Sequence, residues 1–447
     1  MRPSISKSLN RFALVWTGLL LMCAATGKIH PHLVSDTTSY LEYSFASAED
    51  LCTQIRTPGY PAMLRVGSSL FGDNERGLQA IVILQIGLHA IAVCLWYPEL
   101  IQWGMTKRTA AIACIAFAVT NTFWDHVNTI ATDAPAMSLS VIMVALVAKT
   151  WRVGNRGNSR GRTCLIGGLA ACVIAIRPAY LFLIPWLFLA MLVRPAESAL
   201  VPQKKRFRDA IRIALIPVCV VLGWCAFRGS VVGEFGPLPF GHQNMAAVTT
   251  QLLDADELAA LPGSSGELGY AIAQSRRDLY GIENRADATM TIDSRWDDMT
   301  YRVVIPAAEK TIPSGIVDQH QALTKLDRDI VLTYPLRYIK WCVLGFRRGV
   351  WGSFANIAMH SIYFPCLIGF AAWVMYRATQ HSGPQTMDWS PLKPIVLIMI
   401  SYAVMKIGFV TLTSPPVGRF SDAGMVFVPM GIAAFVMTLA GTQTAET

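Results

Sequence analysis

The chain has 447 residues, of which 53% are hydrophobic and 15% charged. Its mean hydropathy is +0.41, and one soluble core would bury far less apolar surface than this composition supplies. The net charge of +9 alone would suit nucleic acid, but Lys and Arg stand mainly in short connections between apolar runs, which is typical of membrane topology. Composition therefore excludes an ordinary soluble domain, predicts the lipid bilayer as a partner and gives no reason to expect nucleic acid.

The first apolar run, Phe12 to Ala25, follows the basic residues Arg2, Lys7 and Arg11 and fits two interpretations. A short apolar stretch after basic residues resembles a signal peptide. It also fits a retained helix, which we favour because of the motif that follows it. Either alternative leaves the next segment starting outside.

Nine further apolar runs follow, and together with the first they predict about ten transmembrane helices. The runs are continuously apolar and do not alternate, so helices that satisfy their own backbone hydrogen bonds are expected in place of a barrel. We therefore predict an all-α polytopic membrane protein. The nine runs are Leu78–Tyr97, Thr109–Phe123, Ala134–Ala148, Thr163–Ile176, Ala179–Val193, Ile213–Phe227, Ile357–Met375, Pro394–Leu412 and Ala423–Leu439.

Basic residues in the short connections predict the orientation. The stretch from Thr163 to Val193 has strongly basic flanks on both sides, so it must go out and come back with Arg177-Pro178 at its outer tip. The sides predicted to be cytoplasmic are the amino terminus, Lys107-Arg108, the cluster from Arg152 to Arg162, and the cluster from Lys204 to Arg212.

The same alternation divides the chain into three parts. Residues 1–228 form an amino-terminal transmembrane module whose first outer loop is catalytic, 229–349 an extracytoplasmic region, and 350–447 the carboxy-terminal transmembrane helices. The middle region is acid-rich and mixes short amphipathic stretches with Gly and Pro. We expect small helices on the membrane surface there and no independent enzyme domain. The expected location is the bacterial inner membrane, with the active site on its extracytoplasmic face.

Two aspartates fall on the predicted outer side. Asp36 follows the first helix, and Asp133 begins the fourth. A carboxylate at the outer mouth of a helix bundle is near water yet partly desolvated, a setting in which it can take a proton from an attacking group. The alternative for each is helix capping, in which the side chain serves only the local backbone.

Several basic residues on the predicted outer side could bind a phosphate group. Guanidinium groups bind phosphate through forked hydrogen bonds, and positive-inside statistics make outward arginines unexpected. Snorkelling or pairing with loop acids is the alternative. A lysine inside a span, Lys406, is costly and normally faces a cavity or a partner. The outward arginines are Arg56, Arg177, Arg347, Arg348 and Arg419.

The ordered motifs resemble the glycosyltransferase C superfamily, which includes protein O-mannosyltransferases and the bacterial aminoarabinose transferase of lipid A. The resemblance covers most of the chain, although each motif is short. Its parts are Asp36 after the first helix, Arg56-Thr57-Pro58-Gly59-Tyr60-Pro61, the Thr132-Asp133 turn, the Arg177-Pro178 tip, and Arg419-Phe420 before a final Pro-containing helix.

The resemblance implies an inverting transferase that moves a sugar from a polyprenyl-phosphate donor to a glycolipid, glycan or protein acceptor. Asp36 would be the catalytic base and Asp133 a second acid that orders acceptor or donor sugar. The implied donor and phosphate contacts are Arg56, Tyr60, Arg177, Arg347, Arg348, Lys406 and Arg419. Thr37 stands where some relatives carry a second acid, so a metal-bridged carboxylate pair is doubtful there, and no cofactor is predicted.

Ten cysteines give no zinc spacing and no disulfide framework, although Cys52 and Cys342, in or near loops, leave one pairing open. Two other functions stay open. A transporter or flippase of a lipid-linked sugar would also place Lys and His inside spans, but no inverted repeat is evident and the charges gather on one side. A non-catalytic assembly subunit is the third alternative.

Overall fold

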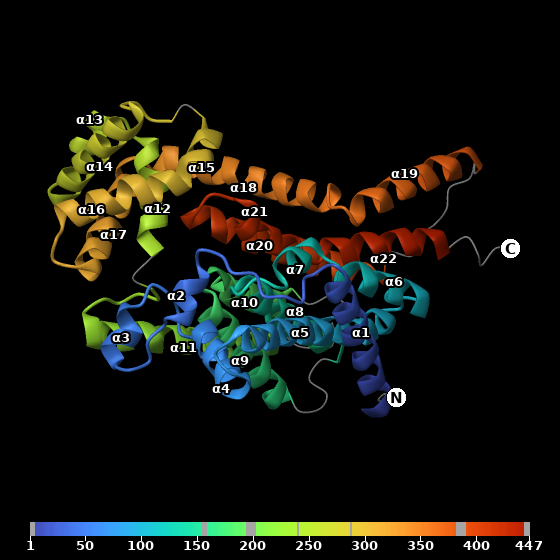
Figure 1. The fold of residues 1–447 in the computed structure, drawn as a ribbon. Coiled ribbons are helices and arrows are strands. Elements are labelled where there is room, and N and C mark those ends of the chain that lie inside the picture. Colours follow the sequence, from blue (N-terminus) through green and yellow to red (C-terminus); the bar gives the residue numbers. More distant parts are fainter. Residues whose placement is uncertain are drawn as a thin grey trace.

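The computed structural model describes residues 5–153, 159–193, 203–238, 241–286, 288–380 and 390–441. Throughout these ranges the regular elements are helices, and the only strand-like feature is an isolated bridge between His32 and Thr129. The prediction of an all-α fold is confirmed for this part of the chain. Figure 1 shows a long helical bundle with a cluster of short helices at one end.

The bundle contains most of the predicted apolar runs as helices. Within the described ranges, six stretches are long and apolar enough to cross a membrane: α1, α5, α8, α11, α20, and residues Gly418–Leu439. This finding supports an integral membrane protein, whereas the predicted count of about ten spans is not confirmed. The bundle helices are α1 (Ile5–Ala25), α5 (Glu75–Gln102), α6 (Lys107–Ala118), α8 (Asp133–Val153), α9 (Ser159–Ile176), α10 (Leu183–Leu192), α11 (Gln203–Val232), α20 (Lys393–Thr413) and α22 (Val428–Gly441).

One predicted span, Ile357–Met375, is wrong as a single helix. The chain instead forms α18 (Pro335–Ala358) and α19 (Tyr363–Gln380), which meet at an angle of 85°. The hydroxyl of Tyr363 donates to the carbonyl of Ala116 at 2.7 Å, which anchors the start of α19 on α6. Counted as one bent span, the pair would raise the number of candidate spans to seven. Helix α18 also runs across the boundary that we drew at residue 349.

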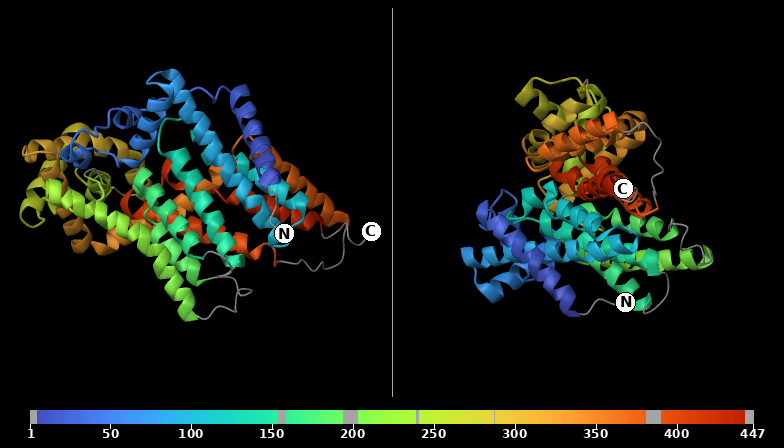
Figure 2. Two further views of the ribbon diagram at one scale, coloured as in Figure 1. Left: turned by 90° about the horizontal axis from the view of Figure 1, so that it is seen from below. Right: turned by 90° about the vertical axis from the view of Figure 1, so that its right-hand side faces the viewer.

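Residues 241–333 form a helical cap at one end of the bundle (Figures 1 and 2). We expected small helices on the membrane surface. The short helices instead pack around a shared apolar core that includes Leu258, Ile272, Val303 and Leu326. The cap contains α12 (Gly241–Thr249), α13 (Ala255–Ala259), α14 (Ser264–Tyr280), α15 (Thr289–Asp298), the π-helix η4 (Met299–Val304), α16 (Ile305–Thr311) and α17 (Ile316–Thr333).

Two arginines hold the cap and the segment that leads into it. Arg337 of α18 binds both carboxylate oxygens of Glu257 in α13, at 2.6 and 2.8 Å. Arg228, buried near the end of α11, donates to the carbonyls of Cys52 and Gly236 and to the carboxylate of Glu234. A buried guanidinium needs such a full set of acceptors. These contacts therefore fix where the chain leaves the bundle and where it returns. Cys52 is a free thiol in this arrangement, as is Cys342.

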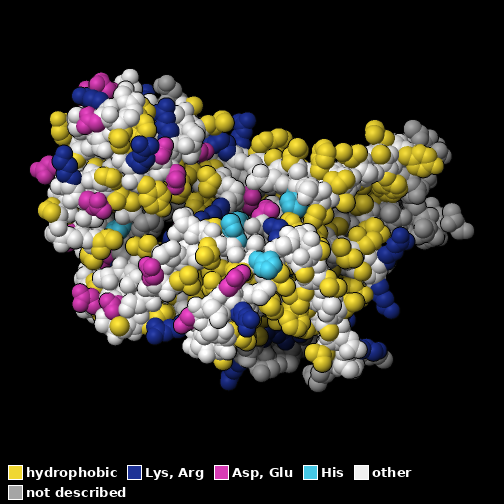
Figure 3. Space-filling model, in the orientation of Figure 1, with side chains coloured by type: hydrophobic (Ala, Val, Ile, Leu, Met, Phe, Trp, Pro, Cys, Tyr) yellow, Lys and Arg dark blue, Asp and Glu magenta, His cyan; other side chains and the backbone are white. Residues whose placement is uncertain are grey.

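Charge is distributed unevenly along the bundle. On the face drawn in Figure 3, Asp and Glu side chains gather over the cap and at the centre, whereas the charged side chains visible at the right-hand end are Lys and Arg. Figure 1 shows α1 and the end of α22 toward that basic end. The cap and these two helices thus lie toward opposite ends of the molecule.

The first loop of the chain is fastened to the turn before α8. The backbone carbonyl of His32 accepts a hydrogen bond from the backbone N–H of Ile130 at 3.0 Å. The backbone N–H of His32 donates to the backbone carbonyl of Asn128 at 2.8 Å. The hydroxyl of Thr37 donates to the carbonyl of Ile130 at 3.0 Å. These bonds bring the start of α2 (Thr37–Leu41) beside the start of α8.

Gly59 allows the helix after the first loop to approach α9 closely. It is the first residue of α4 (Gly59–Phe71), and an added Cβ would lie 2.5 Å from the backbone carbonyl of Ala175. Backbone atoms cannot rotate away as a side chain can, so any larger residue must separate the two helices. The glycine of the Arg56–Pro61 motif therefore has a packing role.

Gly59→Ala should lower the thermal unfolding midpoint of the purified protein in detergent, at a cost of about 1–3 kcal/mol from overpacking. Gly168→Ala in α9 is the matched control, because its added Cβ would have no neighbour within 4 Å. An Ala in a helix is otherwise slightly more stable than a Gly. Equal midpoints for the two variants would contradict the packing role.

Candidate functional site

A cavity of about 760 Å³ lies between the bundle and the cap. The bundle side contributes residues of the first loop, of the Arg177-Pro178 turn, and of the segment before α22. The cap side contributes Asn244, Trp296, Asp297 and Tyr301. The remaining lining residues are Ser35, Asp36, Ser39, Tyr40, Ile55, Arg56, Thr57, Thr132, Ile176, Arg177, Pro178, Ala179, Leu238, Val417, Arg419 and Phe420.

Asp36 faces this cavity and does not cap the helix that it precedes. Its side chain makes no capping hydrogen bond to α2. It accepts instead from Arg56 Nη2 at 2.7 Å through Oδ1, and pairs with Arg419 Nη2 at 2.7 Å through Oδ2. The side chain is 20% exposed. Helix capping therefore does not explain this carboxylate.

Arg56 is held on its other sides by residues of α2. Its Nε donates to the hydroxyl of Ser39 at 2.8 Å, and its guanidinium lies 4.8 Å from the centre of the Tyr40 ring. Tyr60, a predicted donor contact, is fully buried and packs edge-on against Tyr40. Tyr60 thus supports the cavity wall and does not line it.

Asp133 is the first residue of α8, where the partial positive charge of the helix end favours a carboxylate. It pairs with Arg177 Nη1 at 2.6 Å and with Arg419 Nη2 at 3.3 Å. Its side chain is only 5% exposed, and its neighbour Thr132, which also accepts from Arg177 at 2.8 Å, lines the cavity in its place. Asp133 lies behind the arginines.

Arg419 joins the two aspartates into one network. It comes from α21 (Gly418–Ser421), and the same guanidinium nitrogen reaches both carboxylates. Three guanidinium groups therefore face two carboxylates, which leaves one positive charge on this cluster. We call Asp36, Arg56, Asp133, Arg177 and Arg419 the charge cluster. Its members come from four places in the chain: the first loop, the start of α8, the Arg177-Pro178 turn and α21.

Lys406 is near the cluster but outside the cavity lining. It is 1% exposed, and its Nζ donates to the carbonyl of Ala179 at 3.0 Å while lying 4.3 Å from the centre of the Tyr180 ring. Ala179 follows Arg177-Pro178 directly. Lys406 therefore braces the turn that presents Arg177.

Arg347 and Arg348 lie elsewhere. Both line a separate apolar cavity of about 960 Å³ beside α18, together with residues such as Trp351 and Phe354. Arg348 pairs with Asp293 of α15 at 2.7 Å. The structure does not bring either arginine into the charge cluster.

Sequence reasoning did not single out Trp296, Asp297 or Tyr301 as site residues. Trp296 and Asp297 lie in the last turn of α15, and Tyr301 is in η4, a π-helical turn of a kind often found at functional sites. Trp296 donates its indole N–H to the carbonyl of Asn244 at 3.1 Å and packs edge-on against Phe420. Asp297 and Tyr301 are four positions apart, so on a helix they share a face. This spacing was the only feature of the sequence that could have pointed to the two residues as a pair.

Asp297 differs from the other two carboxylates. No ion pair joins it to any residue in the described ranges, whereas its neighbour Asp298 lies 3.8 Å from Arg302. Burial, with the charges of Asp36 and then Asp297, raises the pKa of Tyr301, so its phenol keeps its proton. The cap thus presents an unpaired carboxylate and a hydroxyl donor to the cavity.

The arginines tune the acidity of Asp36. Burial by itself would raise the pKa of this carboxyl, but the charges of Arg56 and Arg419, and their hydrogen bonds, hold the pKa below its usual value. Asp36 is therefore ionised at neutral pH and is a weak base as long as both guanidinium groups stay on it.

The arrangement is suited to an anion. Among the described residues no group of three or more His, Cys, Asp or Glu side chains is placed to hold a metal ion. The cavity instead offers three guanidinium groups, whose forked donors fit phosphate. An entering phosphate would compete with Asp36 for Arg56 and Arg419, and Asp36 would become more basic as those contacts are shared.

Comparison of the chain with protein-family models, with curated proteins and with solved structures finds no match.

The ion pairs of Asp36 should make stability depend on pH in one direction. A carboxyl whose pKa is lowered by folding stabilises the native state above its unfolded pKa of about 3.9, and this stabilisation is lost as pH falls through the folded pKa. The thermal unfolding midpoint of wild type should be higher than that of Asp36→Asn at pH 7. The difference between the two midpoints should shrink below about pH 4. A gap that stays constant from pH 7 to pH 3 would contradict the ion pairs.

Proposed function

We propose that this protein is an inverting glycosyltransferase that takes a sugar from a polyprenyl-phosphate donor at the extracytoplasmic face of the membrane. The observation that carries the proposal is the charge cluster beside a cavity of about 760 Å³ at one end of an apolar helical bundle. The resemblance of the ordered motifs to the glycosyltransferase C superfamily supports the reaction class.

The donor phosphate would bind where the guanidinium groups meet. Arg56, Arg177 and Arg419 all line the cavity, and Arg419 is already shared between two carboxylates, at 2.7 and 3.3 Å. A phosphate that carries the sugar has the charge and the geometry to take over part of this coordination. The net positive charge of the cluster favours its entry.

The proposed reaction is a single displacement. A hydroxyl oxygen of the acceptor attacks the anomeric carbon of the sugar, and the bond from that carbon to the phosphate oxygen breaks. The bonding electrons leave with polyprenyl phosphate, whose negative charge the arginines stabilise. Asp36 accepts the proton of the attacking hydroxyl. In this scheme Asp133, which lies behind Arg177, is a positioning residue.

The extracytoplasmic side is part of the proposal. Its support is the charge distribution: the charged side chains visible at the end remote from the cap are Lys and Arg, whereas Asp and Glu appear among the Lys and Arg of the cap (Figure 3). Cytoplasmic glycosyltransferases use nucleotide sugars, which are scarce outside, so a lipid-linked donor suits this placement. The bacterial inner membrane is the proposed location.

No observation in the structure specifically favours transport of a lipid-linked sugar. Lys406, the intramembrane cation that suggested it, is engaged with the Ala179 carbonyl and the Tyr180 ring. The charge cluster lies beside the cap, whereas a translocation site is expected near the middle of the bilayer.

The decisive test is transfer of radiolabelled sugar from polyprenyl-phospho-sugars in membranes that contain wild type, Asp36→Ala or Asp36→Asn. Loss of the general base should reduce turnover roughly 100- to 10,000-fold. Wild-type activity in both variants would remove Asp36 from the mechanism.

Two arginine variants separate donor binding from folding in the same assay. Arg419→Ala should raise the donor concentration needed for half-maximal rate. Arg348→Ala is the matched control, because Arg348 pairs with Asp293 outside the cavity. Equal donor dependence in the two variants would argue against a phosphate site at Arg419.

The cap side of the cavity is the proposed acceptor side, where Asp297 and Tyr301 can bind hydroxyl groups. Asp297→Ala should raise the half-saturating acceptor concentration, by about tenfold for one lost charge-assisted hydrogen bond, and leave donor dependence unchanged. Asp298→Ala, which removes the adjacent exposed acid, should resemble wild type. A loss confined to donor dependence would place Asp297 on the donor side instead.

A further inference from the structure

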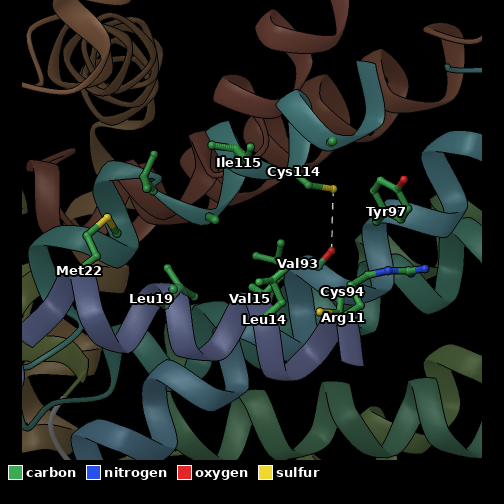
Figure 4. Close-up of a pocket in the computed structure, with 14 residues that line it drawn as sticks. Arg11, Leu14, Val15, Leu19, Met22, Val93, Cys94, Tyr97, Cys114 and Ile115 are labelled. Carbon is green, nitrogen blue, oxygen red and sulfur yellow. Dashed lines mark hydrogen bonds between the residues drawn. The ribbon is translucent and has the colours of Figure 1, made fainter. Parts of the chain in front are cut away.

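A second cavity, of about 570 Å³, lies between α1, α5 and α6 (Figure 4). Its walls are almost entirely apolar. Figure 4 shows Arg11 and Tyr97 at one end and Met22 at the other. Helix α1 also contributes Leu14, Val15, Gly18 and Leu19. The other lining residues are Val93 and Cys94 of α5, Ala111, Cys114, Ile115 and Ala118 of α6, and Val119 directly after α6.

Arg11 is the one cation among the described residues that line this cavity. Its guanidinium lies 4.5 Å from the centre of the Tyr97 ring, and within the described ranges no Asp or Glu forms an ion pair with it. A half-buried guanidinium beside apolar walls is expensive unless an anion or water satisfies its donors. The aromatic ring holds the group at the cavity mouth and leaves its forked N–H donors for a ligand.

The dimensions match one leaflet of a bilayer. Arg11 and Met22 are eleven positions apart on a helix, which corresponds to about 16 Å at 1.5 Å per residue. Half of a hydrocarbon core of about 30 Å is about 15 Å. The cavity thus runs from a cation at its mouth to a depth near the middle of the membrane, along the path of one acyl chain.

The surroundings of the mouth are basic. Lys7 is one helical turn before Arg11, and α6 begins with Lys107 and Arg108. Glu99, an acid near this end of α5, is engaged by Arg152 at 3.0 Å. An anionic head group is therefore favoured over a zwitterionic one.

We propose that this cavity binds one anionic phospholipid, with its phosphate on Arg11 and an acyl chain along α1, α5 and α6. The site is separate from the charge cluster, because the two cavities share no lining residue and α1, which carries Arg11, lies toward the end of the bundle remote from the cap (Figure 1). It does not depend on the proposed transferase activity. In the predicted orientation this lipid belongs to the cytoplasmic leaflet.

Native mass spectrometry of the full-length protein in mild detergent tests the site, with dioleoyl phosphatidylglycerol and dioleoyl phosphatidylethanolamine as competing probes. Wild type should retain one phosphatidylglycerol molecule in preference to phosphatidylethanolamine. Arg11→Ala should weaken this binding about tenfold, as expected for one charge-assisted contact. Lys204→Ala, which removes an exposed charge at the start of α11, outside the cavity lining, should stay within about twofold of wild type, because an exposed charge contributes little.

A second variant keeps the charge and fills the cavity. Gly18 lines it, and an added Cβ there would meet no atom within 4 Å, so Gly18→Leu should fold and exclude the acyl chain. Gly223→Leu in α11 is the control, because its added Cβ also has no neighbour within 4 Å. Loss of phosphatidylglycerol in Arg11→Ala and Gly18→Leu, but not in the two controls, supports the site.

Three outcomes would overturn the proposal. Unchanged phosphatidylglycerol binding in both cavity variants would show that the lipid binds elsewhere. Equal retention of the two lipids by wild type would remove the role of charge. Displacement of the lipid by millimolar inorganic phosphate would indicate a simple anion site without the acyl chain. None of these outcomes bears on sugar transfer.

Discussion

The ion pairs of Arg419 are the interaction on which the candidate site depends. One guanidinium reaches Asp36 at 2.7 Å and Asp133 at 3.3 Å. Charged groups at the end of an apolar bundle are costly to bury one at a time. Together with Arg56 and Arg177 they form a cluster in which each carboxylate has two cations. Removing the shared arginine would leave both aspartates with a single partner each.

The surrounding structure holds the members of this cluster in place. The bonds of His32 and Thr37 to residues 128–130 set Asp36 beside the start of α8. Lys406 braces the turn that carries Arg177, and Gly59 lets α4 approach α9 so that Arg56 and Arg177 share one cavity. A network of this kind preorganises donors toward an anion before it arrives, which is how electrostatic stabilisation becomes effective.

The same ion pairs give the site two states in the proposed mechanism. Without donor, Asp36 is held ionised and weakly basic by Arg56 and Arg419. When a phosphate shares these guanidinium groups, the carboxylate loses part of the stabilisation of its charged form and becomes a better proton acceptor. Donor binding and base activation would then be one event. The unpaired Asp297 across the cavity has no comparable restraint from arginine, which suits a role in binding hydroxyl groups.

The sequence by itself determined the features that arise locally along the chain. Continuous apolar runs must form helices in lipid, so the helical fold and most helix positions, such as α5 and α20, were predictable. The placement of Asp36, Arg56, Asp133, Arg177 and Arg419 on one side followed from counting helices and basic connections. These five residues do converge in the structure.

Only the tertiary structure decided which charged groups meet. Arg347 and Arg348 are the same residue type as Arg419 and were predicted on the same side of the membrane. They nevertheless lie on α18, away from the cluster. The 85° bend after α18, the shared core of the cap and the placement of Asp297 depend on packing between distant segments. The apolar pattern of a segment indicates which of its faces must be shielded from water. It carries no information about which distant segment covers it, because that choice depends on the shapes and charges of both partners.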